Sequence, residues 1–260
     1  MDRLRDKVAI VAGVGPGIGR ASAMTFAREG ASVALVARTR SRLEEIAAEI
    51  EAAGGRALVA PADITDEDQV RTMVGQVVDA FGKIDVLMNN ATYSGGMFNL
   101  VDMPLEEWNQ VLLGALTGVM LCNREVLRHM VSRGSGSVIN VSSGAGKQGF
   151  SRRSHYSAAK AGVNNLTHTL AWEVGRHGIR VNAIVVGAVK GEQTGQGALD
   201  RAQLSGMSID ELEGRWAKRS PLGRMVLPQE VANLALFLAS EESSGMTGQL
   251  LNLTAGVIQF

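Results

Sequence analysis

Short runs of apolar, mostly β-branched residues alternate with amphipathic stretches along almost the whole chain. Apolar runs of this length predict strands that are buried on both faces of a parallel sheet. The seven predicted strands are Val8–Ala12, Ser32–Ala37, Ala57–Ala60, Ile84–Asn89, Ser137–Val141, Arg180–Val186 and Gln249–Leu253. The amphipathic stretches predict helices at Ile18–Glu29, Ser41–Ala53, Asp66–Phe81, Pro104–Arg133, His155–His177 and Pro228–Ala239. This alternation predicts one α/β domain over residues 1–260, a doubly wound parallel sheet of the Rossmann type with about seven strands and helices on both faces.

One segment interrupts the alternation. Residues 187–227 are rich in Gly and Gln, and they contain one predicted short helix at about Ser208–Ala217. A long insertion after a strand end usually serves as a lid or a substrate-binding loop. The segment also carries apolar residues that can pack against the rest of the domain: Met207, Ile209, Leu212 and Trp216. We therefore expect an ordered substrate lid here.

A glycine-rich turn joins the first predicted strand to the first predicted helix. Its glycines stand as Gly13-x-x-x-Gly17-x-Gly19, which differs from the strict G-x-G-x-x-G spacing. Residues without a Cβ let the backbone approach a pyrophosphate, whose charge is met by backbone N–H groups and by the positive end of the helix. In a strand–turn–helix context, this turn predicts a dinucleotide cofactor rather than a purely structural role.

The end of the second strand bears on which dinucleotide binds. A site that prefers NAD usually ends this strand with an acid that binds the ribose 2′-hydroxyl. Here the strand runs into Arg38, and the next acid, Glu44, lies well inside the predicted helix. The Arg38 guanidinium can pair with a 2′-phosphate, although an exposed arginine at a helix start is also common. We expect NADP(H) as the preferred cofactor, with NAD(H) as the alternative.

Tyr156 and Lys160 stand four residues apart in a predicted helix, so their side chains project from the same face. A neighbouring ammonium favours the phenolate, and we therefore expect Lys160 to lower the pKa of Tyr156 from its usual value of ~10. The pair is weak evidence alone, because most such pairs are solvated. Together with the glycine turn, it predicts a proton donor that serves a nucleotide cofactor.

Composition excludes several other classes of function. Equal numbers of basic and acidic residues, 26 of each, give no electrostatic attraction to nucleic acid or to anionic membranes. The single cysteine, Cys122, rules out an intrachain disulfide and a cysteine-cluster metal site, and the histidines show no metal-ligand spacing, so we expect no metal. The first six residues lack the apolar core of a signal peptide, which predicts a cytoplasmic protein.

The chain resembles the short-chain dehydrogenase/reductase family. The resemblance rests on the glycine turn, Asn89-Asn90-Ala91, Ser143 and Tyr156-x-x-x-Lys160 in one order, and it extends to the tail around Thr247-Gly248-Gln249. Each motif alone is unspecific, whereas the combined match is highly specific and covers nearly the whole length. The resemblance implies an oxidoreductase that transfers a hydride between NADP(H) and a small-molecule carbonyl or secondary alcohol, with reduction of an apolar ketone expected.

The resemblance also implies roles for particular residues. Tyr156 would exchange a proton with the substrate oxygen, Lys160 would support Tyr156 and hold the nicotinamide ribose, and Ser143 would stabilise the charge that develops on that oxygen. Ser142 competes with Ser143, which is preferred because its distance from Tyr156 matches the family spacing. The implied cofactor contacts are Gly13, Gly17, Ile18, Gly19, Arg38, Asp63, Ile64, Asn90, Ala91, Tyr156, Lys160 and Gly187.

Three positions depart from the family pattern. Ala115 stands where family members usually have an Asn whose backbone carbonyl supports a proton relay to the lysine. Thr92 replaces a Gly, and Val186-Gly187 replaces Pro-Gly with no following Thr, since Gly191 stands at that position. These departures keep two rivals open: a dinucleotide-binding regulatory or structural subunit with little turnover, and a non-redox epimerase or lyase on the same scaffold.

Residues near the predicted site leave further alternatives open. We expect His155 to be exposed rather than a second proton carrier, and Arg152 and Arg153 to form a solvated basic turn rather than a site for an anionic substrate. Four aromatic or sulfur-containing residues have two equally supported interpretations. They either form an apolar wall of the substrate site or pack against a lid or another subunit: Tyr93, Met97, Phe98 and Phe150. The family resemblance implies a homo-oligomer, a tetramer or a dimer, in which Trp172 and the helices containing Val111–Met130 and Ser157–Leu170 form an interface.

Overall fold

Seven parallel strands form one sheet in the computed structural model, which describes residues 2–191 and 196–260. The strands are β1 (Val8–Ala12), β2 (Ser32–Val36), β3 (Arg56–Val59), β4 (Val86–Asn89), β5 (Gly136–Ser143), β6 (Ile179–Val186) and β7 (Leu250–Leu253). Their order across the sheet is β3-β2-β1-β4-β5-β6-β7, and every neighbouring pair is parallel. The predicted doubly wound parallel sheet is therefore confirmed.

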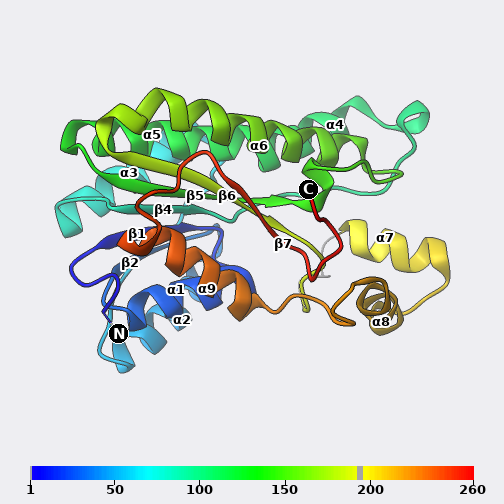
Figure 1. Cartoon of the computed structure of the whole chain (residues 1–260), viewed down its shortest axis with the longest axis horizontal. Coiled ribbons are helices and arrows are strands. Elements are labelled where there is room, and N and C mark those ends of the chain that lie inside the picture. The colour runs from blue at the N-terminus through cyan, green and yellow to red at the C-terminus, as the bar shows by residue number, and fades with distance from the viewer. Residues whose placement is uncertain (1, 192–195) are drawn as a thin grey trace.

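Helices cover both faces of this sheet (Figure 1). In the described residues they are α1 (Ile18–Arg28), α2 (Arg40–Ala52), α3 (Glu67–Phe81), α4 (Leu105–Leu112), α5 (Gly118–Arg133), α6 (Ser154–Val174), α7 (Gln196–Ser205), α8 (Ile209–Arg219) and α9 (Pro228–Ala239). Buried side chains of α1, α2 and α9 pack on one face, and those of α3, α5 and α6 pack on the other. No helix within residues 2–191 and 196–260 has both the length and the hydropathy needed to cross a membrane.

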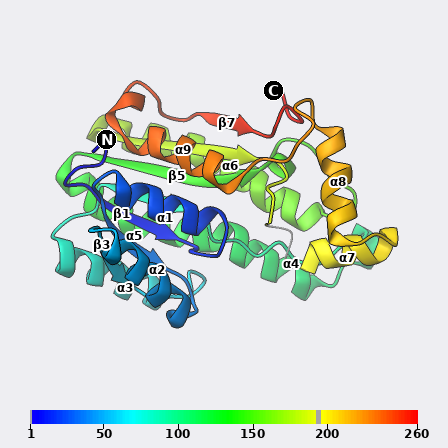
Figure 2. The same cartoon turned by 90° about the horizontal axis from the view of Figure 1, so that it is seen from below.

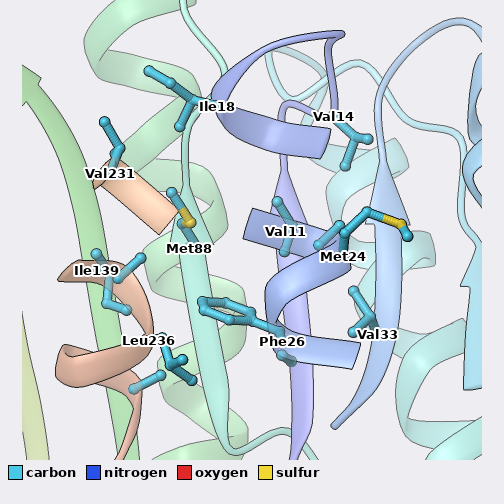
Figure 3. Close-up of a cluster of buried hydrophobic side chains, with 14 of the residues drawn as sticks. Val11, Val14, Ile18, Met24, Phe26, Val33, Met88, Ile139, Val231 and Leu236 are labelled. Carbon is cyan, nitrogen blue, oxygen red and sulfur yellow. The ribbon is translucent and has the colours of Figure 1, made fainter. Parts of the chain in front are cut away.

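The apolar contacts on the α1–α9 face show why this alternation is stable. Phe26 of α1 is fully buried, and burial of such a side chain contributes about 1.5–3 kcal/mol. Figure 3 shows the side chains that meet in this layer: Val11, Val14, Ile18, Met24, Phe26, Val33, Met88, Ile139, Val231 and Leu236. Helix residues spaced three or four apart thus cover strand residues spaced two apart, as the two periodicities require.

The chain reverses its direction of winding between β1 and β4. From β1 it proceeds through β2 to β3 towards one edge, and β4 to β7 then build towards the other edge. Ligands of open α/β sheets bind beyond the carboxyl ends of the strands at such a switch point. At this end of the sheet, α7 and α8 lie side by side beyond the strands (Figure 2).

Two predicted elements differ from the observed ones. The long helix predicted at Pro104–Arg133 is divided into α4 and α5 by a π-helical segment, Leu113–Thr117. The segment 187–227 contains two helices instead of one, and part of it, residues 192–195, lies outside the described residues. Helix α7 escaped prediction because its residues show no clear apolar periodicity, and its position depends on contacts with the rest of the domain.

Candidate active site

The glycine turn is packed against the loop that follows β4. Gly13 has a φ of 100°, and a Cβ at this position would collide with the backbone of Ala91. Asn90 Nδ2 donates to the Gly13 carbonyl at 2.7 Å, and the backbone N–H groups of Asn90 and Ala91 donate to the carbonyl of Ala12 at 2.7 and 2.8 Å. Asn90 and Ala91 therefore hold the turn in place from the neighbouring strand.

The outer side of the turn fits a dinucleotide phosphate. A Cβ at Gly15 would meet no atom within 4 Å, so this part of the backbone is open to a ligand. Helix α1 starts after Gly17 without a side-chain cap, and its first turn carries no acid, which leaves the positive helix end available to an anion. Ile18 itself is buried in the α1–α9 layer (Figure 3), so only its backbone can face a cofactor.

Arg38 lies on the surface just after β2. Its side chain is exposed, and no carboxylate among the residues that the structure describes pairs with it. The neighbouring Arg40, in contrast, pairs with Glu44 at 3.6 Å. Arg38 is thus a cation available for a ligand phosphate at the end of the second strand.

Asp63 and Ile64 follow β3 beside this position. The Asp63 carboxylate accepts hydrogen bonds from the backbone N–H and the hydroxyl of Thr65, at 3.0 and 2.7 Å. The backbone N–H of Ala62 donates to the carbonyl of Ala37, so the loops after β2 and β3 are joined. Ile64 is buried against Gly118 of α5. The expected adenine contacts therefore stand next to the Arg38 segment.

Asn89, the first residue of the Asn89-Asn90-Ala91 motif, has a structural role here. It is buried, and its Nδ2 donates to Asn140 Oδ1 at 2.9 Å and to Asn123 Oδ1 at 3.2 Å. Asn140 in turn donates to the hydroxyl of Thr167 at 3.0 Å. These bonds tie the centre of the sheet to α5 and α6.

The structure brings Ser143 and Tyr156 together at the carboxyl edge of the sheet. Ser143 ends β5, and Tyr156 lies in the first turn of α6. Side-chain hydrogen bonds with Ser143 and Thr92 and the charge of Arg153 favour the Tyr156 phenolate, yet burial outweighs them and raises the pKa of Tyr156. Ser142 points elsewhere, because its hydroxyl donates to the carbonyl of Lys160 at 3.4 Å. The geometry therefore favours Ser143 as the serine partner of Tyr156.

Lys160 lies one turn further along α6 and is 2% exposed. Its Nζ donates to the carbonyl of Val141 at 2.9 Å and lies 5.8 Å from the centroid of the Tyr156 ring. Burial lowers the pKa of Lys160 to about 8. The expectation that Lys160 lowers the pKa of Tyr156 is wrong for this structure, because burial dominates and the charge that acts on the phenol is that of Arg153.

Arg153 and His155 are both buried, which corrects two predictions. The Arg153 guanidinium carbon lies 4.6 Å from the centroid of the Tyr156 ring, so the predicted solvation of this side chain is wrong. The His155 ring lies with Nε2 3.8 Å from Oε1 of Glu107, and burial together with the Arg153 charge lowers its pKa. The spacing of three residues between Arg153 and Tyr156 was the available signal for their contact.

Carboxylates from two distant helices hold the loop after β4. Glu107 Oε1 of α4 accepts from the backbone N–H of Gly96 at 2.6 Å. Asp200 Oδ2 of α7 accepts from the backbone N–H of Met97 at 2.8 Å. Neither Glu107 nor Asp200 belongs to a motif that could be recognised in the sequence. Their role depends entirely on the tertiary position of the loop.

The apolar residues expected at the substrate wall lie on this loop and on the turn before α6. Tyr93 is 40% exposed and Phe150 is similarly accessible, whereas Met97 and Phe98 are half-buried. The backbone N–H of Phe98 donates to the carbonyl of Arg152, which joins the two segments. The wall thus stands beside Tyr156, between the sheet edge and α7.

The three departures from the family pattern have distinct surroundings. Ala115 is fully buried within the π-helical segment, and the side chain of Thr92 lies near Tyr156, where it acts to lower the pKa of the phenol. Gly187 donates its backbone N–H to Leu253 at 3.0 Å, and a Cβ there would approach Thr254 Cα to 2.8 Å. Gly187 therefore shapes the loop after β6 through close packing.

Known proteins share both the sequence and the fold. A family model described as enoyl-(acyl carrier protein) reductase matches residues 13–257. The chain is 38% identical to cis-4-hydroxycyclohexanecarboxylate dehydrogenase of Sinomonas cyclohexanicum, with 96% of each chain covered. It is 36% identical to the 3-oxoacyl-acyl-carrier-protein reductase of Thermotoga maritima, covering 98% of this chain and 99% of the other.

Solved structures agree with these sequence comparisons. A short-chain type dehydrogenase/reductase from Mycobacterium marinum superposes with a TM-score of 0.87 at 35% identity, covering 98% of this chain and 96% of the other. A variant of actinorhodin polyketide ketoreductase with NADPH gives a TM-score of 0.92 at 33% identity, with 98% of each chain covered. This similarity extends over the complete sheet and its helices.

Proposed function

Because this chain belongs to the short-chain dehydrogenase/reductase family of oxidoreductases, we propose that it transfers a hydride between NADP(H) and a small-molecule carbonyl or secondary alcohol. Reduction of a ketone is the proposed direction. The observation that carries the proposal is the cluster of Tyr156, Ser143 and Lys160 at the strand ends, beside an open glycine turn. The nearness of the proposed proton donor to the proposed phosphate cradle, at one end of one sheet, supports this function.

Tyr156 acts as the proton donor to the substrate oxygen. A nicotinamide held beside Tyr156 and Lys160 would supply the hydride for the carbonyl carbon. The side chains of Ser143 and Thr92 favour the Tyr156 phenolate, and the Ser143 hydroxyl would stabilise the charge that develops on the substrate oxygen. The raised pKa keeps Tyr156 protonated at neutral pH, which suits reduction, and the nearby Arg153 charge stabilises the phenolate left after transfer.

Lys160 supports this step from the next turn of α6. With a pKa of about 8 it can hold or release a proton near neutral pH, and its Nζ is fixed by the carbonyl of Val141. In the proposed complex, Lys160 binds the nicotinamide ribose and returns a proton towards Tyr156. Both roles fit the position of Lys160, which is buried one helical turn after Tyr156.

The cofactor contacts belong to the same proposal. Gly13, Gly17 and Gly19 would hold the pyrophosphate at the start of α1, with Asp63 at the adenine and Arg38 at the 2′-phosphate. The free guanidinium of Arg38 supports NADP(H) over NAD(H). A solved ketoreductase of the same fold was obtained with NADPH, which agrees with this choice.

The names of similar proteins support the class of reaction. They include a dehydrogenase of a cyclic hydroxy acid, a 3-oxoacyl reductase and a levodione reductase, and each name describes carbonyl or alcohol chemistry. The levodione reductase structure superposes with a TM-score of 0.91. A carbonyl next to an apolar ring or chain is accordingly the proposed substrate.

The test is a cofactor-oxidation screen of ketones with NADPH and with NADH. We expect turnover of at least one ketone, with a higher kcat/KM for NADPH. General acid catalysis contributes about 10²–10⁴-fold, so Tyr156→Phe should lose on the order of a hundredfold or more of kcat. Tyr93→Phe is the matched variant, because it removes the other phenol of the chain, and its loss should be far smaller.

Four outcomes would contradict parts of this proposal. Normal turnover in Tyr156→Phe would refute the assigned acid, and a wild type that prefers NADH would refute the role of Arg38. Binding of NADPH without reduction of any ketone would favour a regulatory or structural subunit. Conversion of a substrate without net change in NADPH would favour an epimerase or lyase on this scaffold.

A further inference from the structure

Arg153 occupies an unusual place for a guanidinium. It precedes the first residue of α6, it is 8% exposed, and it stacks on the Tyr156 ring. The contact distance of 4.6 Å to the ring centroid is that of a cation–π pair. The charge therefore lies within a few bond lengths of the phenol that is proposed to protonate the substrate.

This guanidinium has no ion-pair partner within the described parts of the chain. No carboxylate there lies within ion-pairing distance of Arg153, and its side chain donates no hydrogen bond to those residues. Glu107 and Asp200 attract it from further away, but their oxygens accept the backbone N–H groups of Gly96 and Met97. Burial of a guanidinium is costly, and a ligand carboxylate paired with Arg153 would offset part of that cost.

A second guanidinium approaches from the lid. Arg201 of α7 stacks on the ring of Trp216 at 4.9 Å. Burial lowers the pKa of Arg201, and repulsion by the charge of Arg153 lowers it further. His155 beside them has a lowered pKa and adds no charge at neutral pH. An anion placed between the catalytic helix and α7 would relieve this repulsion.

We propose that Arg153 binds a carboxylate of the substrate, so that this enzyme acts on small oxo acids and hydroxy acids. The inference rests on the proposed function and names its substrate class. The planar guanidinium matches a carboxylate in two parallel hydrogen bonds. One guanidinium pairs with one carboxylate, so a substrate monoanion matches Arg153. Because Arg153 lies against the Tyr156 ring, the carboxylate and the reacting carbonyl must be only a few bonds apart.

Binding is tested first, with a ligand that cannot react. The full-length protein loaded with NADP⁺ is titrated with cyclohexanecarboxylate and with cyclohexanecarboxamide, which has the same shape without the charge. We expect the carboxylate to bind at least tenfold more tightly, and Arg153→Gln to abolish that preference. Arg152→Gln removes a charge from the same turn and should retain the preference for the carboxylate. Arg153→Lys keeps the charge without the planar fork and should retain only part of it.

Activity is tested with a matched pair of substrates. The ratio of kcat/KM for 4-oxocyclohexanecarboxylate to that for its methyl ester should exceed ten in the wild type and fall towards one in Arg153→Gln. Equal binding of carboxylate and carboxamide by the wild type would overturn the inference, whether or not the variant folds. If the wild type reduces neutral ketones and shows no preference for carboxylates, the inference about Arg153 is overturned while the proposed function stands. A retained carboxylate preference in binding without reduction of any ketone would instead overturn the proposed function.

Discussion

Tyr156 is surrounded by groups that act on its proton in opposite directions. The hydroxyls of Ser143 and Thr92 and the Arg153 guanidinium favour the phenolate, whereas burial favours the neutral phenol and prevails. Lys160, the nearest cation along the helix, is occupied by the carbonyl of Val141. The acid is therefore set for donation at neutral pH, and its supporting charge comes from the residue three positions before it.

The buried ammonium of Lys160 predicts a specific dependence of stability on pH. Below about pH 8 Lys160 is protonated in both the folded and the unfolded state, so the cost of burying the charge is constant. Between about 8 and the ordinary value of 10.5, the folded state has lost this proton while the unfolded state retains it. Stability contributed by this group therefore rises with pH across that window.

Lys160→Met should remove this rise. At pH 7 we expect the variant to be more stable than the wild type, because it buries no charge, and we expect the difference to shrink by roughly 2 kcal/mol on going to pH 10. Urea denaturation at the two pH values measures the effect. Lys218→Met on the exposed face of α8 is the matched control. An identical pH dependence in Lys160→Met and wild type would contradict the burial of a charged Lys160.

At the scale of elements, polar contacts join α7 to the loop after β4 and to α8. Asp200 accepts the backbone N–H of Met97, and Arg201 stacks on Trp216 of α8. Much of α7 is exposed, and segments with few buried contacts open at low free-energy cost. The order of this helix should therefore depend on its polar contacts more than on packing.

Asp200→Ala should loosen α7 without unfolding the domain. Loss of a hydrogen bond to a charged acceptor costs about 1.5–3 kcal/mol, which corresponds to roughly tenfold or faster opening. Hydrogen exchange of the α7 amides, followed by mass spectrometry, should rise by about that factor while exchange in the strands stays unchanged. Asp79→Ala on the exposed face of α3 is the control. Equal α7 exchange in Asp200→Ala and wild type would show that other contacts hold the lid.

At the scale of the whole molecule, the outer surface of α6 carries an apolar side chain that nothing covers in the single chain. Trp172 is 89% exposed at the end of the helix that also carries Tyr156. Large exposed aromatic groups are typical of protein–protein contacts. This placement agrees with the predicted interface through the two long helices, which stays a prediction, as does the cytoplasmic location.

Trp172→Glu should weaken the assembly. A buried charge in the centre of an apolar contact is strongly unfavourable, so the variant should shift a tetramer towards smaller species by at least tenfold in dissociation constant. Size-exclusion chromatography with light scattering measures the mass over a dilution series. Val101→Glu introduces the same charge at a site outside the long helices that is 92% exposed. A wild type that is monomeric at all concentrations would contradict the predicted interface.

The sequence by itself determined the architecture and most of the candidate site. Runs apolar at every position permit only doubly buried strands, and helical stretches between them force parallel neighbours, so the seven-stranded sheet follows from periodicity. The glycine turn could be placed for a similar reason, because Gly13 has a φ of 100° and a Cβ at Gly19 would collide with the carbonyl of Gly13. Tyr156 and Lys160 share a helix face at a spacing that needs no tertiary information.

Tertiary structure alone decided the electrostatics of that site. The burial of His155 and Arg153 depends on α4 and on the loop after β4, which lie some fifty residues earlier in the chain, and the second guanidinium arrives on α7 from fifty residues later. Local spacing specifies which side chains share a helix face, whereas desolvation depends on everything that packs over them. For this reason the sequence could identify the phenol and its lysine, but only the folded chain shows that Arg153 supplies the neighbouring charge.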